Sequence, residues 1–138
     1  MGKNLELESC DIIIRKEQFT SCLIALRSSL IGNYTIRQQS FSKQGLKNID
    51  LNKVEKANDI IDILEACNWK PIFDVNSDII FLEPLLKETS EERLMFKALS
   101  HFITDESRIV YKFDTSFTRV KKILIFKDKH LEIIKQSI

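Results

Sequence analysis

The chain has 138 residues, of which 43% are hydrophobic and 30% are charged, and its formal net charge at pH 7 is +1. This apolar content excludes a disordered tail, and three glycines and two prolines exclude collagen-like and glycine-loop architectures. The apolar runs fall far short of the roughly 20 residues that span a bilayer. We therefore expect one domain, residues 1–138, with one core and no membrane span.

The first half of the chain predicts a strand, a loop and two helices. The β-branched run Asp11–Arg15 is typical of a short strand. Apolar residues at helical spacing predict a helix over Lys16–Ile31 that stops at Gly32 and Asn33. The next two segments predict a strand over Tyr34–Phe41 and a loop over Ser42–Asn52.

A second helix is predicted over Lys53–Asn68, with Asn52 and Asn58 as alternative N-caps. Two strands, Trp69–Val75 and Asp78–Glu83, follow around a tight turn. Thr89 and Glu92 form a capping-box pattern, which predicts the start of a third helix that continues to Ile103.

The last third of the chain predicts a meander of strands. Alternating apolar and charged residues indicate a half-buried strand over Ser107–Phe113. A turn at Asp114–Ser116 leads into a return strand over Phe117–Lys127. A last short strand or helix is predicted to run to Ile133.

The predicted fold class is α+β, with the order β-α-(β)-α-β-β-α-β-β-(β). Strands joined by two or three turn residues must be antiparallel, because a parallel neighbour needs a crossover of a dozen or more residues. We therefore expect a mainly antiparallel sheet with about three helices packed against it.

The sequence indicates no catalytic or cofactor site. Its two histidines, His101 and His130, have no second ligand at metal spacing, and we interpret them as structural and solvated, respectively. Dinucleotide, P-loop and nucleophile-elbow motifs are absent. We therefore expect no metal, no cofactor and no enzymatic activity.

The cysteines and the N-terminus indicate the compartment. Cys10, Cys22 and Cys67 are odd in number, which suits a reducing compartment and buried, unreactive thiols. Acidic residues and an apolar run of only three residues near the N-terminus differ from the basic start and longer apolar region of a signal peptide. We therefore expect a cytoplasmic protein.

Charge is segregated along the chain. Residues 53–107 carry six basic and twelve acidic groups, whereas residues 108–138 carry eight basic and three acidic groups. A nucleic-acid surface would favour exposed aromatics between such charges, whereas we interpret Phe113, Phe117 and Phe126 as core residues. Lysines on a sheet edge also discourage edge-to-edge pairing, and this is the simplest interpretation of the basic block.

The segment Asn58–Phe113 resembles small bacterial immunity proteins of polymorphic or contact-dependent toxin systems. It shares with them a helix that ends in a Trp, here Trp69, followed by a hairpin, a large helix and another hairpin. The resemblance implies a cognate protein toxin as the partner, with no direct contact to nucleic acid or membrane.

Many toxins are nucleases with basic clefts, which an acidic surface can cover. We therefore predict an immunity protein that binds its toxin through six carboxylates: Asp74, Asp78, Glu83, Glu88, Glu91 and Glu92. The alternative is a self-associating structural or adaptor domain without a toxin partner, and a homodimer stays open under either interpretation.

Overall fold

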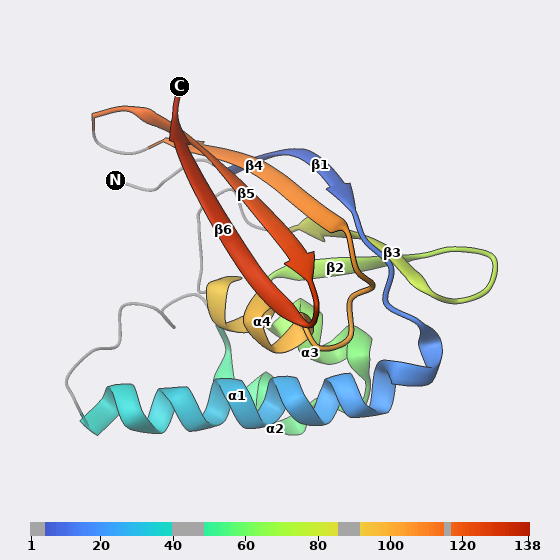
Figure 1. The fold of residues 1–138 in the computed structure, drawn as a ribbon. Helices are drawn as coiled ribbons and strands as arrows, with labels where there is room; N and C mark the ends of the chain where they lie inside the picture. Colours follow the sequence, from blue (N-terminus) through green and yellow to red (C-terminus); the bar gives the residue numbers. More distant parts are fainter. Residues whose placement is uncertain (1–4, 40–48, 86–91, 115–116) are drawn as a thin grey trace.

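The computed structural model describes residues 5–39, 49–85, 92–114 and 117–138. In this part of the chain the protein is α+β, with a four-stranded antiparallel sheet and a separate two-stranded sheet (Figure 1). The predicted fold class is therefore confirmed. The larger sheet has the strand order β1 (Leu5–Asp11), β4 (Ser107–Asp114), β5 (Arg119–Lys127) and β6 (His130–Ser137). The smaller sheet pairs β2 (Trp69–Phe73) with β3 (Ile79–Pro84).

The helices lie on one side of the larger sheet. After a short 3-10 turn at Lys16–Gln18, α1 (Phe19–Gln39) crosses below the sheet, with α2 (Leu51–Lys56) and α3 (Ile60–Ala66) beside it (Figure 1). The fourth helix, α4 (Glu92–Leu99), lies between α1 and the sheet. The core fills the space between these layers.

Aromatic side chains join three elements in this core. The rings of Trp69 and Phe96 meet edge to face with their centroids 5.2 Å apart, and the ring of Phe126 lies 6.2 Å from that of Phe96. All three side chains are buried. They connect β2, α4 and β5, which fixes α4 against the sheet.

The first strand lies earlier in the chain than predicted. β1 begins with the alternating leucines and glutamates of residues 5–8 and ends at Asp11. Ile12 and Ile14, which follow it, are buried in the core. The Ile14 N–H donates to the Ile79 carbonyl at 2.8 Å, and the Ile79 N–H returns a bond of 2.9 Å. The prediction of a strand over Asp11–Arg15 was therefore wrong, and this run joins the two sheets.

The first helix continues past its predicted end. Gly32 lies inside α1, where nothing comes within 4 Å of the position of a side chain, so the helix reaches Gln39. A glycine in a helix costs roughly 1 kcal/mol and does not oblige the helix to end. The prediction of a strand from Tyr34 was therefore wrong. Residues 40–48, which carry most of the predicted loop, lie outside the described residues.

The predicted second helix is two helices. Asp50 caps α2 by accepting from the Lys53 N–H at 3.2 Å, and Asp59 caps α3 by accepting from the Asp62 N–H at 2.8 Å. Neither predicted cap, Asn52 nor Asn58, has this role. The break is stabilised from outside, because the Arg27 guanidinium on α1 donates to the carbonyls at the end of α2.

The later elements follow the prediction more closely. Both predicted hairpins form, and the last segment is a strand that extends to Ser137. The third helix begins at Glu92 but ends at Leu99, before the predicted Ile103. Thr89, the first residue of the predicted capping box, lies outside the described residues.

Candidate functional site

Two of the six predicted contact residues shape the β2–β3 turn. The Asp74 carboxylate accepts from the backbone N–H groups of Asn76 and Asp78 at 2.9 and 3.0 Å. The Asp78 carboxylate accepts from the Lys16 N–H at 2.9 Å and lies 3.5 Å from the Arg15 guanidinium. The Asp78 side chain is only 8% exposed. The expectation that Asp78 lies on an exposed patch was therefore wrong, because its carboxylate holds the hairpin to the start of the helical layer.

Of the other four predicted contacts, only Glu83 has a side chain among the described residues. Glu83 is exposed on β3, opposite Lys70 of β2. Glu88 and Glu91 lie outside the described residues, and Glu92 begins α4 with its side chain outside them. Their role as toxin contacts stays a prediction.

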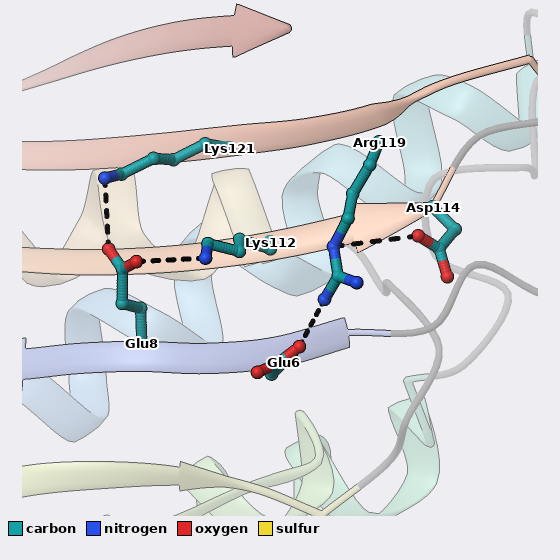
Figure 2. A network of polar contacts seen from close by, with 6 residues as sticks. All are labelled: Glu6, Glu8, Lys112, Asp114, Arg119 and Lys121. Atoms are coloured by element: carbon teal, nitrogen blue, oxygen red, sulfur yellow. Dashed lines mark hydrogen bonds and ion pairs between the residues drawn. The ribbon is translucent and has the colours of Figure 1, made fainter. Parts of the chain in front are cut away.

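The basic residues, in contrast, separate onto the two faces of the larger sheet. On the outer face, which carries Glu6 and Glu8, Lys112, Lys121 and Arg119 are paired with acids (Figure 2). The Glu8 carboxylate lies 3.2 Å from the ammonium groups of both Lys112 and Lys121. Arg119 lies between Glu6 and Asp114. Carboxylates of β1 therefore lie beside Lys112 of β4 and beside Lys121 and Arg119 of β5.

These contacts change the acidity of one group. Hydrogen bonds from Lys121 and Lys112 hold the pKa of Glu8 below its ordinary value, because they stabilise the ionised carboxylate. Glu8 lies at a β-bulge, where the register with β4 shifts between Leu7 and Ser9. The bulge turns its side chain toward both lysines.

On the core face, a groove of about 990 Å³ opens between α4, the β5–β6 turn and β6. Five cationic side chains line it: Arg93, Lys97, Lys122, Lys129 and Lys135. No acidic side chain is among its described lining residues. Four of the cations, all except Lys122, form no ion pair with any described residue.

Two of these cations face each other across neighbouring strands. Lys122 of β5 is directly opposite Lys135 of β6, a like-charge arrangement that costs stability in a sheet. The Lys122 ammonium lies 5.8 Å from the centre of the buried Tyr111 ring, a cation–π contact that compensates part of this cost. A bound anion would relieve the repulsion further.

The floor and one end of the groove are fixed by the fold. Leu131 and Ile133 supply an apolar floor. The buried Ser100 hydroxyl lies 2.6 Å from the Lys97 carbonyl oxygen and 3.3 Å from that of Lys129. This hydroxyl therefore links the end of α4 to the β5–β6 turn, the two segments that border the groove at this end.

Two histidines also border the groove. His101 and His130 line it beside the cations, so the histidines interpreted as structural and solvated both border the same site. In the described residues, no group of three or more His, Cys, Asp or Glu side chains is placed to hold a metal ion.

Burial raises the pKa of Cys10 to about 11 and those of Cys22 and Cys67 to about 12, so the neutral thiols predominate at pH 7.

The sequence contains only a partial signal for this groove. The basic excess of the last third includes Lys122, Lys129 and Lys135, but periodicity cannot say which of its lysines meet acids on the outer face. Arg93 and Lys97 lie four residues apart on α4, within the segment 53–107 that has an acidic excess. That spacing places them on one helix face, which is the signal that could have been used.

In comparisons with known proteins, no family model, curated protein or solved structure matches this chain. Within the described residues, none of the helices has the length and apolar character needed to cross a membrane.

Proposed function

We propose that this chain is a protein-binding module whose groove holds an acidic segment of a partner protein. The observation that carries the proposal is the group of cations around Leu131 and Ile133, four of which have no described acidic partner. On the outer face, Lys112, Arg119 and Lys121 already form ion pairs with carboxylates of this chain. An acidic partner would therefore gain most from the groove.

The groove chemistry favours a peptide over a nucleic acid. Single-stranded nucleic acids are held by aromatic stacking platforms together with positive charge. No Phe, Tyr or Trp is among the described lining residues, and the floor is aliphatic. A segment rich in carboxylates would pair with the cations that line the groove.

The resemblance adds a toxin as the candidate partner. Under this part of the proposal, the chain is an immunity protein that occupies a functional surface of the toxin, without catalysis. Co-expression with a candidate toxin encoded next to its gene, scored for growth rescue, tests this role. Rescue that persists after loss of the groove cations would assign the contact to another surface.

Binding of a fluorescent decaglutamate peptide to the full chain tests the groove directly. The double variant K97E/K135E should weaken binding by at least about tenfold, because two attractive charges become repulsive. The matched control, K53E/K56E, makes the same charge change at exposed residues of α2. It should change affinity less than about threefold, through net charge alone.

Equal losses in the two double variants would contradict the groove assignment, because they would show a response to overall charge. Tighter binding of a single-stranded oligothymidine than of decaglutamate would instead assign the groove to phosphates.

A further inference from the structure

β6 is an edge strand of the larger sheet. It pairs with β5 over its whole length without a bulge, and no described strand pairs with its other side. In Figure 1, β6 forms the near edge of the sheet and its start lies beside α4. Such an edge presents a row of backbone donors and acceptors to a partner strand.

The backbone register shows which residues present those groups. The Ile138 N–H donates to the carbonyl of Arg119, the first residue of β5. The backbone N–H of Ile138 is therefore directed toward β5. Because hydrogen-bonded and non-hydrogen-bonded pairs alternate along an antiparallel ladder, the even-numbered residues of β6 bond to β5. The odd-numbered residues Leu131, Ile133 and Lys135 therefore direct their N–H and C=O groups to the open edge.

The same three residues have their side chains on the groove side of the sheet. Leu131, Ile133 and Lys135 all line the groove. In an antiparallel pair, directly opposite side chains project from the same face. A strand added to β6 would therefore place every second side chain over the groove, facing the cations of α4.

We propose that the acidic segment binds as an extended strand that adds antiparallel to β6, with acidic residues at alternate positions directed into the groove. This inference rests on the proposed function and specifies the conformation of the ligand. Backbone hydrogen bonds at the odd-numbered residues bind the added strand. The cations Arg93, Lys97 and Lys135 favour a strand with negatively charged side chains. A second copy of this chain is a poor occupant, because it would bring its own groove cations against these.

The probe is a seven-residue peptide, Glu and Val in alternation with Glu at both ends, added to the full chain. Saturating peptide should slow amide hydrogen exchange of Leu131, Ile133 and Lys135 by at least about tenfold, because their N–H groups gain acceptors. The amides of Glu132 and Ile134 already bond to β5 and should change little.

Two N-methylated peptides provide matched controls. Methylation of two Glu amides, which face β6 in an antiparallel pair, should weaken binding by at least about tenfold. Methylation of two Val amides, which face away from β6, should weaken it less than about threefold.

Binding that depends on the groove cations but leaves the odd-numbered amides unprotected would overturn strand addition and retain the groove. Equal effects of the two methylations would overturn it as well. Binding that K97E/K135E does not weaken would instead overturn the proposed function itself.

Discussion

Glu8 illustrates what a single side chain contributes to this fold. Its carboxylate contacts lysines of both β4 and β5, although it belongs to β1 at the edge of the sheet (Figure 2). Asp78 acts similarly between the β2–β3 turn and the residues that precede α1. Both carboxylates connect segments that are distant in sequence, so no local pattern could identify their partners.

The lowered pKa of Glu8 predicts a pH dependence of stability. A carboxylate whose folded-state pKa is depressed stabilises the fold above its unfolded pKa, and this contribution is lost as pH falls through the folded value. Glu8→Gln should therefore reduce the free energy of unfolding at pH 7 and have little effect once the pH lies below the lowered folded-state pKa, where the native carboxylate is itself protonated. Urea unfolding across this range measures the difference, and a constant effect at all pH values would contradict the assignment.

At the scale of elements, sequence patterns predicted what local chemistry decides. Alternation identified β4, and the turn between Phe73 and Ile79 was visible from its residues. The end of α1 was missed because Gly32 permits a turn but does not require one. The break after α2 was missed because its stabilising group, Arg27, comes from another helix.

The β5–β6 turn has a conformation that its residues fit imperfectly. Asp128 and Lys129 both have positive φ, 53° and 62°, as the two central residues of a type I′ turn do. Asn followed by Gly is the preferred pair there, so D128N/K129G should raise the free energy of unfolding by about 0.5–1 kcal/mol. As a control, Lys135→Gly, inside β6, should lower it by a similar amount. Destabilisation by the turn variant, measured by urea unfolding, would show that the turn has another conformation.

At the scale of the whole molecule, a net charge near zero conceals two differently composed faces. On the outer face of the larger sheet, Lys112 and Lys121 pair with Glu8 of β1, whereas the core face carries a cationic groove beside α4. The groove unites Arg93 with Lys135, which are far apart in sequence. Composition revealed the basic excess, but only the fold shows which cations lie together and which are neutralised.

The most direct test of the central claim is an NMR titration of the full chain with decaglutamate, followed by amide chemical shifts. We expect the largest changes at Lys97, at Lys129 and along β6, with little change at Lys112 and Lys121 on the outer face. Changes concentrated on the outer face or at the β2–β3 turn would contradict the claim that the groove is the binding site.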